Sequence, residues 1–322
     1  MPAWRNFTGQ TLEDIQGWGW ANALHPDDAA RTAAVWRRAV AARERYETEY
    51  RTRRHDGVYR HFLARGVPVL RDDGSVREWV GTCIDITERR GQEEELRKLN
   101  RTLRALSRSN EALMRAEEEL AFLEEVCRIV VQDCGYAMVW IGYASDDEDR
   151  SVRPVAHAGF SGGYLETLTL TWADREQGRG PTGTSIRTGK PILCADMLTD
   201  PRFEPWRDEA LKRGYASSLA LPLLDAGRAF GAVTIYSTQP DSFSEEEIQL
   251  LSEMAADLTY GIASLRLRLQ SRQTLQALQD SETRFRQLAD SMPQLVWTAD
   301  PVGRVDYFNR RLSFFTTHGP WR

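Results

Sequence analysis

The stretch that decides the fold is residues 215–237, which read YASSLALPLLDAGRAFGAVTIYS. Two apolar runs flank the turn residues Asp225-Ala226-Gly227, and strand-forming runs joined by a short glycine-containing segment predict a β-hairpin. Two further strands are predicted upstream, at 136–143 and 152–157. Residues 125–245 are therefore expected to form one α/β region with an antiparallel sheet.

Long helices are predicted on both sides of this region. Ser244 lies three residues before Glu247, a capping box that predicts a helix from Glu245 to about Asp290. Residues 88–125 contain neither Gly nor Pro after Gly91 and predict a second long helix. The apolar residues of both helices mostly follow coiled-coil spacing: Leu96, Leu99, Leu103, Leu106, Leu113 and Leu120 in the first, with Asn110 on the same seam, and Leu251, Met254, Leu258, Ile262, Leu265 and Leu269 in the second.

The favoured interpretation of these two seams is a parallel dimer through Leu96–Leu120 and Leu251–Leu269. An isolated helix with such a seam would leave a long apolar stripe in water. The alternative is that each helix packs on its own domain.

The two ends of the chain contain further short elements. Asp27 or Asp28 is expected to cap a helix that runs from Ala29 to about Arg43, because an Asp carboxylate accepts N–H groups of the first turn. The segments 58–70 and 76–87 flank a turn around Gly74 and predict a hairpin. A third hairpin is predicted at 295–308, around Pro301-Val302-Gly303.

The composition excludes several functional classes. The chain has 322 residues, a net charge of −5 and 41% hydrophobic residues, so it can form about two globular domains and lacks the basic surplus of a nucleic-acid binder. No apolar run is long enough to span a membrane or resembles a signal peptide. The four cysteines form no C-x-x-C pair. These features predict a cytoplasmic protein without a membrane span, a disulfide framework or a cysteine-based zinc site.

No motif in the sequence predicts catalysis or metal binding. Residues 178–183 match G-x-G-x-x-G, but Pro181 removes a backbone donor and no hydrophobic strand precedes them, so a loop is favoured over a dinucleotide site. Asp196, Asp200 and Arg202 are interpreted as caps and an ion pair. His157 follows a predicted strand and is favoured as a structural residue over a haem ligand.

Three segments contain motifs of known families. The first segment contains Gly17-Trp18-Gly19-Trp20, His25-Pro26-Asp27-Asp28, Asp56-Gly57, Gly81-Thr82 and Asp85-Ile86-Thr87-Glu88-Arg89, and the last contains Phe285-Arg286 and Trp297-Thr298-Ala299-Asp300. With these motifs, residues 1–90 resemble a PAS domain that lacks its first strands, and residues 285–322 resemble the truncated start of a second one.

The middle segment contains Glu124-Glu125-Val126-Cys127, Gly189-Lys190-Pro191-Ile192, Asp200-Pro201-Arg202-Phe203 and Gly231-Ala232-Val233. With these motifs, residues 121–266 resemble a GAF domain.

The resemblance implies an α+β protein in which antiparallel-sheet PAS and GAF domains are joined by coiled-coil-like linker helices at 91–120 and 267–284. It implies a sensory module that binds a small ligand or relays a signal to an output domain missing from this chain, as in the parent sensor histidine kinases of two-component systems. The alternatives are the sensory region of a diguanylate cyclase or phosphatase, or a dimerisation scaffold that binds no ligand. The two partial PAS segments suggest a gene fragment.

The resemblance also bears on the ligand. The flavin-binding motif of photochemical PAS domains and the Cys-His pair of bilin-binding GAF domains are absent, and Cys194 is followed by Ala195. The cofactor is therefore left open. A pocket is expected between the sheet and the segment 171–200. The candidates for its wall are Trp140, His157, Tyr164, Trp172, Cys194 and Asp196.

Overall fold

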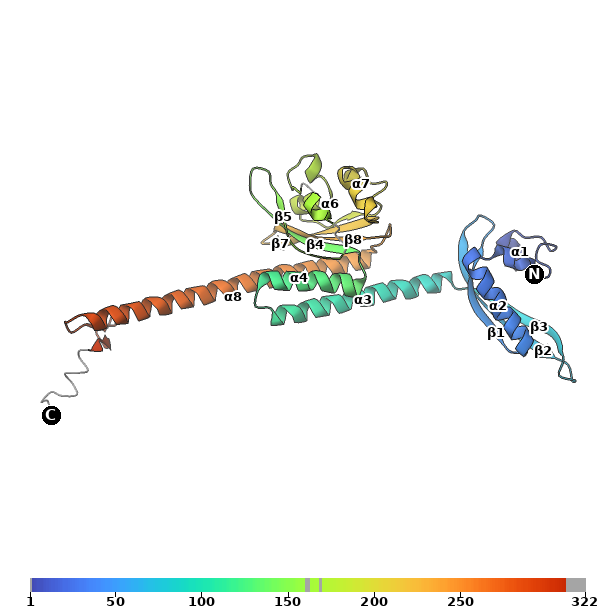
Figure 1. The fold of residues 1–322 in the computed structure, drawn as a ribbon, viewed down its shortest axis with the longest axis horizontal. Coiled ribbons are helices and arrows are strands. Elements are labelled where there is room, and N and C mark those ends of the chain that lie inside the picture. The colour runs from blue at the N-terminus through green and yellow to red at the C-terminus, as the bar shows by residue number, and fades with distance from the viewer. Residues whose placement is uncertain (1, 160–162, 168–169, 311–322) are drawn as a thin grey trace. The chain divides into compact units, whose positions relative to one another are not determined.

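The computed structural model of the chain describes residues 2–159, 163–167 and 170–310 (Figure 1). The chain divides into two units, residues 1–100 and 101–322, and each is described by itself. The part of the predicted second PAS segment that follows residue 310 lies outside the described residues.

The N-terminal unit is built on a three-stranded antiparallel sheet in the order β1-β2-β3. The predicted hairpin is confirmed, and Gly74 occupies its turn with a φ of 75°. Strand β1 was not predicted. It reads YETEYRTR, and the residues that face inward are two tyrosines and two threonines. Because these residues carry hydroxyl groups, the strand lacks the clear alternation of apolar and polar residues that marks a half-buried strand. The strands are β1 (Tyr46–Arg53), β2 (Tyr59–Leu70) and β3 (Val76–Asp85).

Helices of the N-terminal unit pack on the inward face of this sheet, around Tyr50 and Phe62. They are α1 (Pro2–Thr8), the 3-10 turn η1 (Gly19–Ala23) and α2 (Pro26–Ala42). The predicted cap of α2 was wrong, because Pro26 takes the first helical position and His25 becomes the N-cap, accepting from the N–H of Asp27. Asp28 instead accepts from the backbone N–H and the Nε of Arg51 on β1, both at 2.9 Å.

The second unit contains a five-stranded antiparallel sheet in the order β5-β4-β8-β7-β6. The hairpin predicted in residues 215–237 is confirmed as β7 and β8, with Gly227 in the turn at a φ of 82°. The strands are β4 (Met138–Ala144), β5 (Val152–Gly159), β6 (Ile192–Cys194), β7 (Ser217–Asp225) and β8 (Arg228–Ser237).

One face of this sheet is covered by a layer of helices (Figure 1). The layer consists of α4 (Glu119–Ile129), the first half of α8 (Glu245–Ser291) and the part of α3 (Thr87–Arg115) that follows residue 100. The predicted uninterrupted helix over 88–125 was wrong: α3 ends at Arg115, and α4 starts at Glu119 and returns beside it. Gly261 of α8 permits the close packing, because a Cβ there would lie 2.9 Å from atoms of both Leu113 and Phe122.

The two predicted dimer seams have different surroundings. Most of the seam on α8 is buried in the core of its own domain, as Leu251, Leu258 and Ile262 show, so that stretch follows the alternative interpretation. On α3, Leu96 and Leu103 are exposed. The buried residues of α3 are Thr102, Ala105 and Ser109. Asn110 donates to Asp257 of the same chain at 3.1 Å.

Helix α8 begins as predicted. The Ser244 hydroxyl accepts from the N–H of Glu247 at 3.3 Å. The Glu247 carboxyl is buried within the helical layer, where its Oε1 accepts from the Tyr136 hydroxyl at 2.6 Å and from the Thr102 hydroxyl at 3.3 Å. The carboxyl thus connects three segments: α3, the residues just before β4 and α8.

The C-terminal half of α8 runs on beyond the sheet with exposed side chains. It is followed by the predicted hairpin, β9 (Trp297–Ala299) and β10 (Val305–Phe308), which forms a separate two-stranded sheet. Asn309 joins the hairpin to the end of the helix by donating to the carbonyl of Ala289 at 2.8 Å. Among the described residues, no helix combines the length and apolar character that a membrane span requires.

Candidate functional site

The other face of the five-stranded sheet is covered by short helices and connecting segments (Figure 1). They enclose a second apolar cluster that includes Met138, Trp140 and Met197. The short elements are α5 (Tyr164–Thr167), η3 (Glu176–Gly178), α6 (Pro181–Thr188), η4 (Pro201–Trp206) and α7 (Arg207–Lys212). Between the sheet and this covering layer, where a pocket was expected, the structure has a small cavity.

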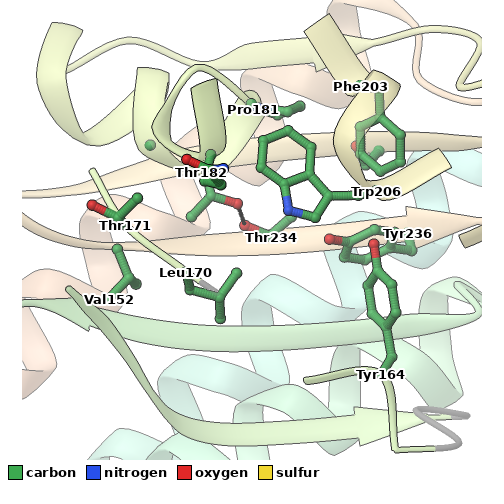
Figure 2. Close-up of a pocket in the computed structure, with 14 residues that line it drawn as sticks. Val152, Tyr164, Leu170, Thr171, Pro181, Thr182, Phe203, Trp206, Thr234 and Tyr236 are labelled. Carbon is green, nitrogen blue, oxygen red and sulfur yellow. Dashed lines mark hydrogen bonds between the residues drawn. The ribbon is translucent and has the colours of Figure 1, made fainter. Parts of the chain in front are cut away.

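The cavity has a volume of about 30 Å³, which is enough for roughly one or two water molecules (Figure 2). Its floor comes from the central strands and its walls come from the covering layer. The described residues that line it are Val152, Tyr164, Leu170, Thr171, Gln177, Gly180, Pro181, Thr182, Gly183, Phe203, Trp206, Ser218, Thr234 and Tyr236.

The start of α6 forms one wall of the cavity. Pro181 takes the first helical position directly after Gly180, where its fixed φ suits the helix and its missing N–H costs no hydrogen bond. The Thr182 and Thr234 hydroxyls lie 2.9 Å apart and tie this helix to β8. Gly180 is required by the indole of Trp206, since a Cβ on Gly180 would lie 2.4 Å from a ring carbon.

Arg187 holds the loop before α6 in place. Its guanidinium donates to the carbonyls of Trp172, Ala173 and Gly178 at 2.9, 3.1 and 2.6 Å. Burial lowers the pKa of Arg187 from its ordinary value. The G-x-G-x-x-G match is thus a turn and a helix start beside the cavity, consistent with its interpretation as a loop.

Three tyrosines pack together at the other end of the cavity. The ring centroid of Tyr236 lies 5.8 Å from that of Tyr164 and 5.0 Å from that of Tyr215. Burial raises the pKa of Tyr236 to about 12 and also raises the pKa of Tyr164. Both phenols are therefore protonated at neutral pH.

The predicted wall residues lie at scattered positions, and Tyr164 is the one that lines the cavity. Trp140 is fully buried on β4. His157 is exposed on β5, opposite Trp140 in the strand register. Trp172 donates its Nε1 to the carbonyl of Ser145 at 2.9 Å and packs under the Arg150 guanidinium.

The last two predicted residues serve the segment that follows β6. Cys194 is buried at the end of β6, and burial raises the pKa of its thiol to about 12. Asp196 accepts from the N–H of Leu198 at 2.9 Å and from the Thr199 hydroxyl at 3.1 Å. Asp196 therefore caps a turn, as expected, and Asp200 pairs with Arg202 at 2.6 Å. A role of these residues in ligand binding stays a prediction.

Sequence reasoning missed most of the cavity wall. Ser218 and Thr234 lie on the β7–β8 hairpin, but in the sequence they resemble ordinary strand residues among apolar neighbours. Trp206 lies in η4, far along the chain from α6. The segment Asp200–Phe203, which supports the GAF resemblance, could have indicated Trp206 as a wall residue, because both belong to the same short stretch of chain.

A larger cavity lies in the N-terminal unit and was not predicted. Its volume is about 780 Å³, within the range of small-molecule sites, and it opens along the inward face of the three-stranded sheet. The Tyr46 hydroxyl is buried there, and burial, with Cys83 adding to it, raises its pKa to about 12. The aromatic residues that line it are Trp4, Phe7, Trp20, Trp36, Tyr46, Tyr50, Phe62 and Trp79.

Family models match part of each unit. The PAS fold family matches residues 1–83, and the GAF domain family matches residues 116–263. The GAF match contains the five-stranded sheet, its covering layer and the cavity of Figure 2.

Curated relatives include a protein named as a sensor. The methyl sulfide methyltransferase-associated sensor of Methanosarcina acetivorans is 25% identical over 310 residues, which are 92% of this chain and 28% of that protein. An uncharacterized protein, y4lL of Sinorhizobium fredii, is 41% identical over 92 residues, 29% of this chain and 11% of that protein. The peroxide stress-activated histidine kinase mak1 of Schizosaccharomyces pombe is 35% identical over 75 residues, 23% of this chain and 5% of that protein. The chain thus spans less than a third of the length of each of these relatives.

Solved structures with a similar fold include two proteins that cover the second unit. The GAF domain of a phosphoenolpyruvate-protein phosphotransferase from Coxiella burnetii is 20% identical, with a TM-score of 0.44 over 53% of this chain and 97% of that chain. A free methionine-R-sulfoxide reductase from Neisseria meningitidis is 18% identical, with a TM-score of 0.43 over 52% of this chain and 91% of that chain. The family matches and the sensor relative together fit a signal-transduction sensory module, in which residues 1–83 match the PAS fold family and residues 116–263 match the GAF domain family.

Proposed function

We propose that this chain is the non-catalytic sensory part of a longer protein, in which the GAF domain binds a small molecule and α8 relays the binding event to an output domain of the histidine-kinase type. The curated relatives support a longer protein, because each extends far beyond the part that aligns with this chain. We also propose that the β9–β10 hairpin starts a second PAS domain and that the protein is cytoplasmic. The free state of all four cysteines supports that location.

The observation that carries the proposal is the division of the GAF sheet into two faces. The cavity lies on one face, and the helical layer with α8 covers the other. Residues of β8 alternate between the two: Thr234 and Tyr236 face the cavity, whereas Val233 and Ile235 pack in the cluster that contains α8. A ligand that shifts the strand can therefore move the helix packed behind it.

We further propose that the exposed half of α8 pairs with a second copy of the chain in a parallel coiled coil. Leu278 and Phe285 are spaced seven residues apart on α8, and Leu288 lies three after Phe285. The side chains of these three residues are between 45% and 65% exposed, and the Phe285 ring also contacts Tyr307 of β10, with ring centroids 5.5 Å apart. Pairing would cover the apolar surface of these residues that remains exposed.

Light scattering on the full chain at tens of micromolar tests the dimer. We expect a dimer that dissociates in the variant Leu278→Gln/Phe285→Gln. Leu198→Gln is the matched control, because Leu198 is equally exposed (61%) but lies in the loop after β6. A monomeric parent protein, or a dimer unaffected by the double substitution, would contradict the pairing.

Native mass spectrometry of the purified chain, together with a thermal-shift screen of metabolites, tests ligand binding. We expect a bound small molecule or a stabilising metabolite whose effect is lost when Trp206 is replaced by Ala. If neither appears, the chain is a scaffold that works through its helices alone, and the sensory proposal for the GAF cavity is wrong.

A further inference from the structure

The GAF cavity is lined by uncharged residues on all the sides that the structure describes. Arg187, on the helix that forms one wall, is already engaged by three backbone carbonyls of the loop before α6. A charged ligand enclosed here would lack a counter-charge. Burial of an unpaired ion is strongly unfavourable, so the lining selects against charged molecules.

Two kinds of hydrogen-bonding group are available to a neutral ligand. The Ser218 hydroxyl is fully buried, lines the cavity and has no hydrogen-bond partner among the described residues. The N–H groups of Thr182 and Gly183 belong to the first turn of α6, which has no intrahelical acceptors for them. A buried polar group without a partner is unfavourable, so a ligand that supplies a partner gains affinity.

Trp206 determines the shape of the space. Figure 2 shows its indole lying across the cavity between Thr182 and Phe203. The indole packs directly on Gly180, where no side chain separates the two. Because the cavity measures only about 30 Å³, a ligand larger than a few atoms has to displace part of its wall, and we expect the half-buried Trp206 ring to move. A flat molecule can do so and then lie against the indole face.

We propose that the GAF cavity binds a flat, uncharged molecule with an amide-like group, whose acceptor faces the α6 N–H groups and Ser218, and that Trp206 closes over it. This inference rests on the proposed sensory function and names the ligand class of the same site. Trp206 acts as a positioning residue for the ligand, and the absence of a side chain at Gly180 leaves room for its indole.

Three probes of nearly equal shape test the charge selection: benzamide, benzoate and benzamidinium, which are neutral, anionic and cationic at pH 7. The full chain is titrated with each probe, and binding is followed through the indole N–H resonance of Trp206, assigned with Trp206→Phe. We expect benzamide to bind with a Kd on the order of 1 mM, as its size permits. We expect each charged probe to bind at least about 10-fold more weakly.

Matched variants locate the binding. Ser218→Ala should weaken benzamide binding about 3- to 10-fold, since it removes one buried hydrogen bond. Ser185→Ala is the control, because the Ser185 hydroxyl is equally buried and unpartnered among the described residues but does not line the cavity. Gly180→Ala should shift the Trp206 resonance in the free protein, because the added Cβ would clash with the indole in its present position.

The outcomes separate this inference from the sensory proposal. Equal or tighter binding of benzoate or benzamidinium overturns the ligand class but leaves a ligand-binding GAF domain. Absence of benzamide binding also overturns the class, whatever the metabolite screen finds. An effect of Ser185→Ala as large as that of Ser218→Ala overturns the assigned site. The inference is supported if benzamide binds, if its affinity is weakened in Ser218→Ala, and if its affinity is unchanged in Ser185→Ala.

Discussion

Substitution of Tyr136 by Phe tests whether the buried Glu247 carboxyl holds the helical layer together. The substitution removes one hydroxyl, which donates to Oε1 of Glu247 at 2.6 Å, and retains the ring that stacks on Phe243 at 5.2 Å. Oε2 of Glu247 has no partner among the described residues, so loss of the Tyr136 hydroxyl leaves the carboxyl with the longer bond from Thr102. Loss of a partner from a buried polar group costs about 1–3 kcal/mol. We expect Tyr136→Phe to lower the stability of the GAF domain by about 2 kcal/mol.

Native-state hydrogen exchange on the full chain is the suitable assay, because a chain of two units need not unfold in one step. The slowest amides of β4 and β8 report the opening of the GAF core. Tyr260→Phe is the control, since Tyr260 lies on α8 with 71% of its surface exposed. Thr102→Val should cost less than Tyr136→Phe, and the double variant should cost more than the sum, because it removes both donors. A loss below about 0.5 kcal/mol for Tyr136→Phe, or one equal to that of Tyr260→Phe, would refute the reasoning.

Three further predictions concern packing and pH. Gly142→Ala should destabilise the GAF domain by about 1–3 kcal/mol in the same exchange assay, because its Cβ would lie 2.5 Å from the ring of Trp140. The raised pKa of Tyr236 should make the GAF domain less stable in alkali. The protonated Tyr236 phenol contributes fully to the stability below the unfolded-state pKa of about 10, and this contribution is lost as the pH rises towards 12. Absorbance at about 295 nm reports the ionisation of tyrosine, and circular dichroism reports the unfolding. The Arg51 guanidinium, through its hydrogen bond, lowers the pKa of Asp28, so the PAS unit should lose stability as the pH falls below about 4, and Asp28→Asn should abolish that part of the pH dependence in urea titrations.

Controls for these predictions are available in the chain. Gly91→Ala adds a Cβ to α3 where no atom lies within 4 Å, so it should not destabilise the protein. Asp27→Asn should leave the acid dependence largely intact, because the Asp27 side chain is 73% exposed and 3.3 Å from Arg51. Unchanged stability of Gly142→Ala, a GAF domain that stays folded up to pH 12, or an acid dependence that persists in Asp28→Asn would contradict the respective argument.

The parts of the fold that the sequence predicts are those that local chemistry determines. The three hairpins were found because each needs a glycine with positive φ in its turn, as at Gly74, Gly227 and Gly303. The start of α8 was found because Ser244 caps it. The break after Arg115 was missed, since neither Gly nor Pro marks it. Tertiary packing on Gly261 accompanies that break, and no local pattern records such a contact.

The candidate site was predictable in position but largely not in composition. The long connection over the sheet indicated where a pocket would lie. The side chains that line it come from several separate segments, and the inward residues of β7 and β8 cannot be told from ordinary core residues by pattern. Tyr164 was among the residues predicted for the wall, whereas Ser218 carries no feature that distinguishes it from a buried structural serine.

The continuity of α8 has a mechanical consequence. Its 47 residues correspond to a rod of about 70 Å, fixed in angle at one end by Leu251, Leu258 and Ile262 in the GAF core. The direction in which Phe285 faces is therefore set by the number of residues between it and the core, at about 100° per residue. One residue inserted after Gln270 would rotate the far end by about a quarter turn, whereas seven would change its phase by only about 20°. Natural variation in the length of this segment should therefore occur in steps of seven residues.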